Sequence, residues 1–205
     1  MELYIVRHGE TDCNKQSILQ GMKIPSYLNE KGEKQAECVG RRLKNIKFDH
    51  IYCSDFPRAV KTAEIIKEEL DCKPPLSERA ELRDRNYGDF EGHTWAEVRA
   101  ILNTNAQRSV IEASPNGESL YEVKERIENF IAFLKEVHKE KENILLVTHH
   151  GAVIMLFVCL LELTLKSHRN FHFDNCSVSH FHIGDEYNKL KLANDTSHLS
   201  ELSQK

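Results

Sequence analysis

The chain has 205 residues, of which 40% are hydrophobic, and this is enough for one domain with a substantial buried core. Charged residues make up 29% of the chain, the formal net charge is -4, and the basic residues are scattered along the sequence. This composition is typical of a globular protein. It argues against nucleic acid as a partner, because a mildly acidic chain without a basic cluster has little attraction for a phosphate backbone.

The cysteines and the apolar segments indicate a cytoplasmic protein. The six cysteines include no C-x-x-C pair, and we expect no signal peptide before the first strand. We therefore expect reduced thiols in a reducing compartment. The most apolar run, Gly151–Leu163, is too short to cross a bilayer. It predicts a buried helix and no membrane partner.

The first half of the chain alternates short apolar runs with helical periods. We expect strands at Leu3–Val6 and His50–Ser54. Asn29 is a suitable cap for a helix that ends near Leu43, and Pro57 suits the first turn of the next helix. Strands that alternate with crossover helices predict a largely parallel sheet.

The second half begins with polar helical segments. Thr94 and Ser119 are expected to cap two helices, and both helices fall within residues 86–140, where we expect a small helical cap inserted into the domain. Asn143–His149 is a continuous apolar run ending in polar residues. Such a run predicts a strand that is covered on both faces.

The last segment predicts a hairpin, SVSHFHI and NKLKLA around GDEY, followed by a loose end, DTSHLSELSQK. Taken together, the elements predict an α/β protein, a three-layer α/β/α sandwich with a mainly parallel sheet. We expect one domain over residues 1–205.

Two predicted strands end in the same kinds of residue. The first strand leads into Arg7 and His8, and the strand from residue 143 ends at His149 and is followed by His150; a glycine follows each pair. Ligands of open parallel sheets bind outside the carboxyl ends of the strands. His8 and His149 are therefore expected to face one crevice if their strands are neighbours. A strand end that only turns through glycine at the solvent edge is the plainer alternative.

Arg58 follows a third strand, in the segment SDFPRAVKTA, and is expected in the first turn of a helix at the same edge of the sheet. Guanidinium groups offer planar paired donors that match phosphate oxygens. Two of them together with two imidazoles predict a local pocket for a dianion. A solvent-facing charge on the first helical turn is the alternative.

Five segments in this order, RHGETDCN, SDFPRAVKTA, LRDRNYGDFEG, PNGES and VTHHG, resemble the histidine phosphatase superfamily in its phosphoglycerate mutase-like branch. The resemblance covers nearly the whole chain. It implies that His8 is the nucleophile that becomes phosphohistidine. It also implies that Arg7, Arg58 and His149 hold the phosphoryl oxygens.

The same resemblance implies further contacts with the substrate. Asn14 and the backbone around Gln20 and Gly21 match the loop that contacts phosphate. His150 stands where relatives often carry glycine, so it is expected to contact the substrate through its ring or to offer its backbone N–H.

Asp84 falls where the family usually has the glutamate of L-R-E, the proton donor to the leaving group. Aspartate is one methylene shorter than glutamate, and displacing a catalytic group by about 1 Å lowers the reaction rate on the order of a hundredfold. Glu81 and Glu91 therefore remain alternative acids. A local bond from Asp84 to its own backbone is the structural alternative.

The chemistry implied by these residues needs no cofactor and no metal. A neutral imidazole is a competent nucleophile, and phosphoryl transfer asks mainly for cations around the phosphoryl oxygens. His180 and His182 near Cys176 have the residue types of a zinc cluster. Because a third ligand at firm spacing is missing, we expect a polar strand face there.

We expect a phosphatase that acts on a small phosphorylated metabolite. Only 55 residues separate Gly92 from Thr148, whereas the mutases of this family have a longer insertion after the acid motif. A cofactor-dependent phosphoglycerate mutase and a non-catalytic module that binds a phosphate ligand stay open as alternatives. Neither the ester nor the oligomeric state is predicted.

Overall fold

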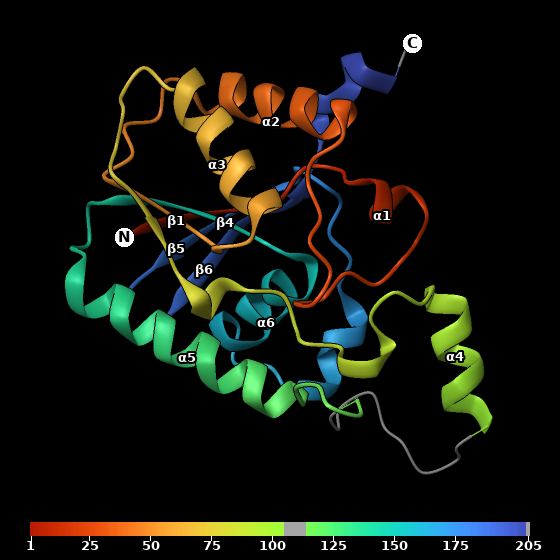
Figure 1. Ribbon diagram of the computed structural model, residues 1–205. Helices are drawn as coiled ribbons and strands as arrows, with labels where there is room; N and C mark the ends of the chain where they lie inside the picture. The colour runs from red at the N-terminus through yellow and green to blue at the C-terminus, as the bar shows by residue number, and fades with distance from the viewer. Residues whose placement is uncertain (105–113, 204–205) are drawn as a thin grey trace.

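The computed structural model describes residues 1–104 and 114–203, and within them a central sheet has the strand order β3-β2-β4-β1-β5-β6 (Figure 1). The strands are β1 (Glu2–Arg7), β2 (His50–Cys53), β3 (Leu76–Glu78), β4 (Asn143–Thr148), β5 (Val178–Ile183) and β6 (Asn188–Asp195). The first four of these run parallel to one another, while β5 is antiparallel to both of its neighbours, β1 and β6. The predicted mainly parallel sheet and the terminal hairpin are confirmed.

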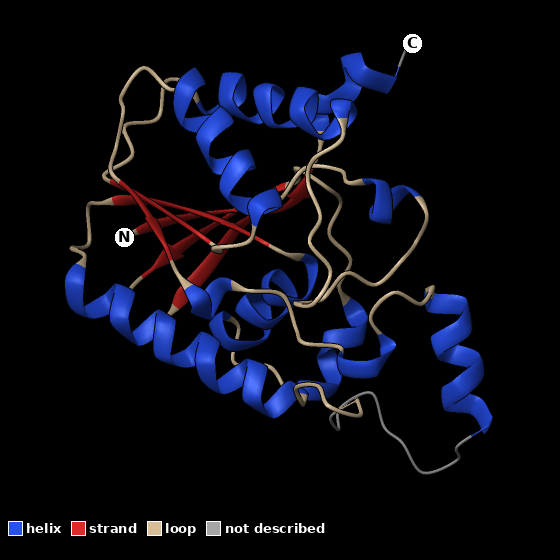
Figure 2. Ribbon diagram, in the orientation of Figure 1, coloured by secondary structure: helices blue, strands red, loops and turns tan. Residues whose placement is uncertain are grey.

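Helices cover both faces of the sheet (Figures 1 and 2). On one face lie α2 (Glu30–Leu43) and α3 (Pro57–Glu69), and on the other α5 (Leu120–Val137) and α6 (His150–Leu160). The shorter elements are α1 (Asp12–Lys15), α4 (Trp95–Thr104), η1 (Ala80–Leu82), η2 (Gly88–Phe90), η3 (Leu165–Asn170) and η4 (Ser197–Ser203). This is the predicted three-layer sandwich.

Strand β4 is buried on both faces. Ile144 and Leu146 pack in the cluster that includes α5 and α6, and Leu145 and Val147 pack in the cluster that includes α2 and α3. All four are 0% exposed. The side chains of a strand alternate between the faces of the sheet, so a strand with a helix layer on each side must be apolar throughout.

Local capping signals set the helix ends as predicted. The Asn29 side chain accepts a hydrogen bond from Gly32 N (2.9 Å) at the start of α2, and Pro57 occupies the first turn of α3. Ser119 and Glu122 form a reciprocal capping box at the start of α5. The two side-chain caps satisfy backbone N–H groups that have no partner within the helix, and Pro57 has no N–H group to satisfy.

Helix α6 is the buried helix expected at Gly151–Leu163, although it begins at His150 and ends at Leu160. Its side chains Val153 and Leu156 are 2% and 0% exposed. Along the described ranges 1–104 and 114–203, no helix has both the length and the apolar character needed to cross a membrane.

Residues 86–140, where we expect a cap, include helix α5, which packs in the core. Val123, Ile127 and Phe130 of this helix are at most 1% exposed and pack in the core, because the apolar stripe of a helix needs a surface to cover it. Helix α4 lies apart from the sheet (Figure 1). A cap therefore remains a prediction for the segment around α4, and residues 105–113 of the predicted range lie outside the described residues.

Residues 195–203 do not form the loose end that we expected, and residues 204–205 of that segment lie outside the described residues. The side chain of Arg42 on α2 forms an ion pair with Asp195 and donates to Ser197 Oγ (3.0 Å). His198 Nε2 donates to the carbonyl oxygen of Cys176 (2.9 Å). These contacts attach η4 to the domain through polar tertiary interactions, which leave no periodic signal in the sequence.

Glu2 of β1 joins three strands through its carboxylate. It accepts hydrogen bonds from His180 Nε2 (2.6 Å), His182 Nδ1 (3.0 Å) and Lys191 Nζ (2.8 Å). Burial acts to raise the pKa of Glu2, but the bonds from Lys191, His182 and His180 outweigh it and lower the pKa to about 2. The two histidines considered for zinc thus bind a carboxylate, and Cys176 is buried in the hydrophobic cluster that includes α2 and α3. No group of three metal-binding side chains occurs among the described residues.

Glu2→Gln is expected to lower the free energy of unfolding at pH 7 by about 1–2 kcal/mol. A carboxyl group whose pKa is depressed on folding stabilises the protein above its unfolded value of 4.5, and this contribution disappears as the pH falls toward 2. Urea unfolding across this pH range should show the difference between variant and wild type shrinking. Glu37→Gln, which alters an exposed pair on α2, is the matched control. A difference that stays constant with pH would contradict the argument.

Candidate active site

The carboxyl ends of β1, β4 and β2 lie side by side. Arg7 is paired with Thr148 in the parallel register of β1 and β4, and His8 N donates to Thr148 O (2.8 Å). The residues after each strand, His8 and His149, are therefore neighbours, with ring centroids 5.1 Å apart. On the other side of β4, Ser54 N at the end of β2 donates to the backbone of that strand. The structure thus brings together the three strand ends from which the site was predicted.

His8 is a buried, neutral imidazole with a defined tautomer. Its Nδ1 lies 2.8 Å from the carbonyl oxygen of Gly9, and a carbonyl only accepts, so Nδ1 carries the proton and Nε2 the lone pair. Burial, Arg58 and Arg7 hold the pKa of His8 well below its ordinary value. The ring is 2% exposed. An imidazole in this state has a free lone pair on Nε2 and needs no deprotonation to act as a nucleophile.

His149 has the opposite tautomer. Its Nδ1 accepts a hydrogen bond from Arg58 Nε (3.1 Å), so Nε2 carries the proton and donates to Ser54 Oγ (2.8 Å). Burial and the neighbouring Arg58 hold the pKa of His149 well below its ordinary value. Its contacts thus fix the ring between a cation and a hydroxyl group.

Arg58 is 1% exposed, so the alternative of a solvent-facing charge on the first helical turn is wrong. Besides His149, its guanidinium donates to Ser26 Oγ through Nη1 and to the Gly21 carbonyl through Nη2, both at 3.0 Å. Ser26 Oγ in turn donates to Gln20 Oε1 (2.5 Å). The loop that carries Gln20 and Gly21 is thereby attached to the first turn of α3.

Arg7 contributes a second buried guanidinium. Its Nη1 donates to the Phe173 carbonyl (2.7 Å), and its Nε is buried with no hydrogen-bond partner within the described residues. Burial lowers the pKa of Arg7, and the negative charges of Asp84 and Asp174 oppose this shift. The group remains a cation, because an arginine pKa lies far above neutral pH.

Asn14 lies in α1, directly after the turn that follows His8. Its Oδ1 accepts hydrogen bonds from Thr11 N and from Asn175 Nδ2, both at 3.2 Å. Asn175 Nδ2 also donates to the carbonyl oxygen of His8 (2.9 Å). In this structure the Asn14 side chain holds the backbone around His8.

Asp84 lies against the first turn of α6. A Cβ atom on Gly151 would approach Asp84 Oδ1 to 2.8 Å, so glycine at this position makes room for the carboxyl group. Burial raises the pKa of Asp84 above its ordinary value, against the opposing effects of Arg58, the Arg85 N–H and Arg7. The nearby charges of Arg58 and Arg7 place Asp84 in the same cluster as the imidazoles.

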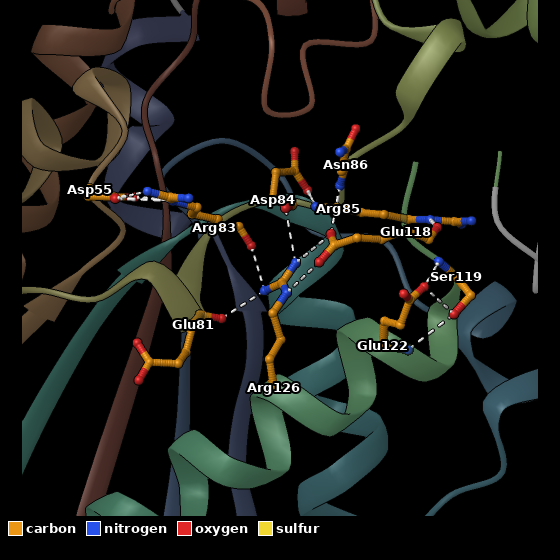
Figure 3. A network of polar contacts seen from close by, with 10 residues as sticks. All are labelled: Asp55, Glu81, Arg83, Asp84, Arg85, Asn86, Glu118, Ser119, Glu122 and Arg126. Carbon is orange, nitrogen blue, oxygen red and sulfur yellow. Dashed lines mark hydrogen bonds and ion pairs between the residues drawn. The ribbon is translucent and has the colours of Figure 1, made fainter. Parts of the chain in front are cut away.

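The two alternative acids are placed differently from Asp84. The carboxyl group of Glu81 points away from that of Asp84 (Figure 3). Glu91 is occupied by three backbone N–H groups, those of Met22, Lys23 and Tyr87. Its carboxylate is thus engaged by the backbone of two segments of the chain.

His150 is the first residue of α6. Its Nε2 is buried without a hydrogen-bond partner in the part of the chain that the structure describes. Burial, Arg7 and His172 lower its pKa to about 3, and the ring lies 5.4 Å from that of His172. His150 is therefore a neutral ring next to the cluster.

Sequence reasoning missed three side chains that hold the site together: Ser26, Ser54 and Asn175. Ser54 had a usable signal, since it is the polar residue at the end of a strand and the first residue of the motif that contains Arg58. Ser26 and Asn175 had none, because they reach the site through loops whose course depends on the whole fold.

Comparisons with known proteins agree with this geometry. A family model described as "Histidine phosphatase superfamily (branch 1)" matches residues 3–196. An adenosylcobalamin/alpha-ribazole phosphatase of Salmonella typhimurium is 32% identical over 95% of this chain and 96% of its own length. The structure of a phosphoserine phosphatase from Entamoeba histolytica, in complex with 3-phosphoglyceric acid, has a TM-score of 0.82 at 26% identity and covers 97% of this chain and 98% of that one.

A shorter but more similar match is fructose-2,6-bisphosphatase TIGAR of Xenopus tropicalis, which is 40% identical over 69% of this chain. The matched region is 52% of TIGAR, so this chain spans about half the length of that relative. From the family match over nearly its whole length, the chain belongs to the histidine phosphatase superfamily, among its phosphoglycerate mutase-like phosphatases.

Proposed function

We propose that the protein hydrolyses a small phosphomonoester through a phosphohistidine formed at His8. The observation that carries this proposal is the His8 ring, neutral and oriented by the Gly9 carbonyl, beside the cations Arg7 and Arg58. Attack by Nε2 forms the N–P bond and breaks the bond between phosphorus and the ester oxygen. The imidazole becomes positively charged as it gives its electron pair to phosphorus.

Arg7, Arg58 and His149 are proposed to hold the phosphoryl oxygens. Two guanidinium groups stabilise the charge that spreads over these oxygens in the transition state. The buried Nε of Arg7, which lacks a partner within residues 1–104 and 114–203, supports this role. Arg58 would exchange some of its present contacts, with Ser26 and Gly21, for phosphate oxygens.

Asn14, Gln20, Gly21 and His150 are proposed to surround the rest of the substrate. Gln20 and Gly21 lie in the loop attached to Arg58, so the backbone N–H groups of this loop are held close to the phosphate. The unpartnered Nε2 of His150 supports a contact with the substrate.

Asp84 is proposed as the general acid and base. In the first step its carboxyl group gives a proton to the leaving alkoxide; in the second, the resulting carboxylate takes a proton from the water that attacks phosphorus and releases His8. The raised pKa supports this role, because it keeps the acid protonated to higher pH.

A substrate panel tests the proposal against its alternatives. Phosphoserine, alpha-ribazole phosphate and fructose 2,6-bisphosphate follow from the names of the relatives, and the phosphoglycerates test for mutase activity. Release of free phosphate supports a phosphatase. Transfer between positions, stimulated by a bisphosphate, would identify a mutase, and binding without turnover would identify a non-catalytic module.

We further propose that the protein works in the cytoplasm on a phosphorylated metabolite. All six cysteines are free thiols in the structure, which supports a reducing compartment. The net charge of -4 favours a small anion, bound at a local cationic site, as the partner of this protein and disfavours a nucleic acid.

Chelation with EDTA is expected to leave the rate of hydrolysis unchanged. The proposed scheme takes its nucleophile from His8 and its positive charge from Arg7 and Arg58, so no step depends on a metal ion. Phosphate release from 4-nitrophenyl phosphate, measured before and after dialysis against EDTA, checks this. A loss of activity that added Mg²⁺ or Zn²⁺ restores would contradict it.

A further inference from the structure

The Asp84 carboxyl group has little of its own to hold it in place. The hydrogen bond that the structure describes on it comes from Arg85 N (2.9 Å), the next residue along the chain. Such a local bond moves with the backbone and does not fix the group relative to His8. The position of the acid must therefore be set by the backbone of residues 81–86, which we call the acid loop.

Arg126 of α5 binds this backbone at three places (Figure 3). Its Nη1 donates to the carbonyl oxygens of Glu81 (2.7 Å) and Arg83 (2.9 Å), and its Nη2 donates to that of Asp84 (3.0 Å). The remaining carbonyl of this stretch, that of Leu82, accepts from Thr148 Oγ1 (2.6 Å). Four consecutive carbonyl groups are thus held by side chains.

Glu118 completes the arrangement. It accepts from Arg126 Nε (3.1 Å) and Nη2 (3.2 Å), and its Oε2 also accepts from the backbone N–H of Asn86 (2.8 Å). Arginine has five N–H donors, and these contacts account for all five. The guanidinium is therefore committed to the protein and not to a substrate.

We propose that Arg126 is a positioning residue for the reaction, which holds the acid loop so that Asp84 reaches the leaving oxygen. This inference rests on the proposed role of Asp84 as the acid. The loop is anchored directly to the catalytic strands, because Thr148 immediately precedes His149. Precise anchoring matters here, because displacing a catalytic group by about 1 Å lowers the reaction rate on the order of a hundredfold. Aspartate is also one methylene shorter than glutamate, so its reach depends more on the position of the backbone.

Arg126→Met tests the proposal through the leaving group. We expect a loss of about 10- to 100-fold in kcat/KM for an alkyl ester such as glycerol phosphate, and a loss below about threefold for 4-nitrophenyl phosphate, whose phenolate leaves without a proton. Arg126→Lys keeps the charge but has three donors in place of five, so it should restore only part of the alkyl activity. Lys124→Met, in an exposed ion pair on the same helix, is the matched control.

The pH profile separates the effect of Arg126 on the position of Asp84 from the effect of its positive charge. The Arg126 cation lowers the pKa of Asp84, so its removal in Arg126→Met should move the alkaline limb for the alkyl ester to higher pH. Arg126→Lys should leave this limb unchanged while its alkyl rate is still reduced. A structural role alone would lower the rates for both esters equally.

The outcomes distinguish this inference from the proposed function. If Asp84→Asn loses alkyl activity selectively and Arg126→Met does not, the positioning role is wrong while the acid stands. If Asp84→Asn shows no selective loss, there is no acid at Asp84 to position, and both ideas fail. Should Arg126→Met not fold, as judged by circular dichroism, Arg126→Lys and Glu118→Gln carry the same comparison. Equal losses on both esters in these variants would overturn the proposal.

Discussion

His8→Ala is expected to abolish hydrolysis of every ester, with a fall of at least about 10⁴-fold in kcat, because it removes the imidazole that is proposed to form the N–P bond. The ring is buried and adjoins the His149 ring, so its removal leaves Arg7 and Arg58 around a phosphate that has no nucleophile. The variant should still bind inorganic phosphate, because these cations remain. Binding without turnover is therefore the expected result.

Single-turnover experiments give the direct measurement. Wild-type protein mixed with a limiting amount of labelled substrate and quenched in alkali should retain a covalent phosphoryl group that acid removes, as phosphohistidine does. His8→Ala should retain none. His93→Ala, an exposed histidine outside the cluster, is the control and should behave like wild type. A labelled protein in the His8→Ala sample would place the nucleophile at another residue.

The pH dependence gives a second test of the neutral nucleophile. Burial, Arg58 and Arg7 keep the pKa of His8 well below its ordinary value, so the ring stays unprotonated down to acidic pH. No limb of the rate profile near pH 6.5 should therefore arise from His8. An exposed imidazole would instead lose half of its reactive form near that value.

The fold was predictable where the sequence is periodic. Continuous apolar runs marked β1 and β4, and caps such as Asn29 and Ser119 marked the helix starts. The parallel pairing of Arg7 with Thr148 then explains why motifs more than a hundred residues apart meet. Strand-end motifs carried the site because parallel strands deliver their last residues to one edge.

The remaining parts depend on contacts that no short pattern reveals. Strand β3, Leu76–Glu78, has three residues and gains its identity only from pairing with β2. The segment η4 is held by polar bonds to Arg42 and Cys176. Helix α5 has a long polar face that resembles a cap helix, and only the tertiary structure shows that its narrow apolar stripe lies in the core.

The residues of the candidate site also fall into a group that the sequence predicts and a group that only the tertiary structure shows. Residues that are proposed to meet the phosphate were predicted from their type and position, whereas the residues that hold them in place were not. Asn175, Ser26 and Arg126 act through side-chain bonds to backbone or to other side chains across long stretches of sequence. Such bonds are made by the folded geometry, and a single sequence carries no separate mark of them.

Asp84→Asn is expected to reduce kcat/KM for alkyl esters by about 10²- to 10⁴-fold and for aryl esters by less than about threefold. An alkoxide is a poor leaving group without a proton, while a nitrophenolate departs unaided. The amide keeps the size of the carboxyl group and the acceptor for Arg85 N, so the loop need not move. Dephosphorylation should also slow, because the same group activates water.

The pH profile identifies Asp84 as the source of the effect. Burial raises the pKa of Asp84. In wild type the rate of alkyl-ester hydrolysis should therefore be highest below this pKa and should fall as the pH rises through it. Asp84→Asn should lack this descending limb, because the amide does not titrate. Gly151→Ala gives an independent check, since its methyl group would lie 2.8 Å from Asp84 Oδ1 and displace the acid without removing it. Gly151→Ala should show the same selective loss of kcat/KM for alkyl esters but should keep the descending limb of the pH profile. Equal losses of kcat/KM for alkyl and aryl esters would place the proton donor elsewhere.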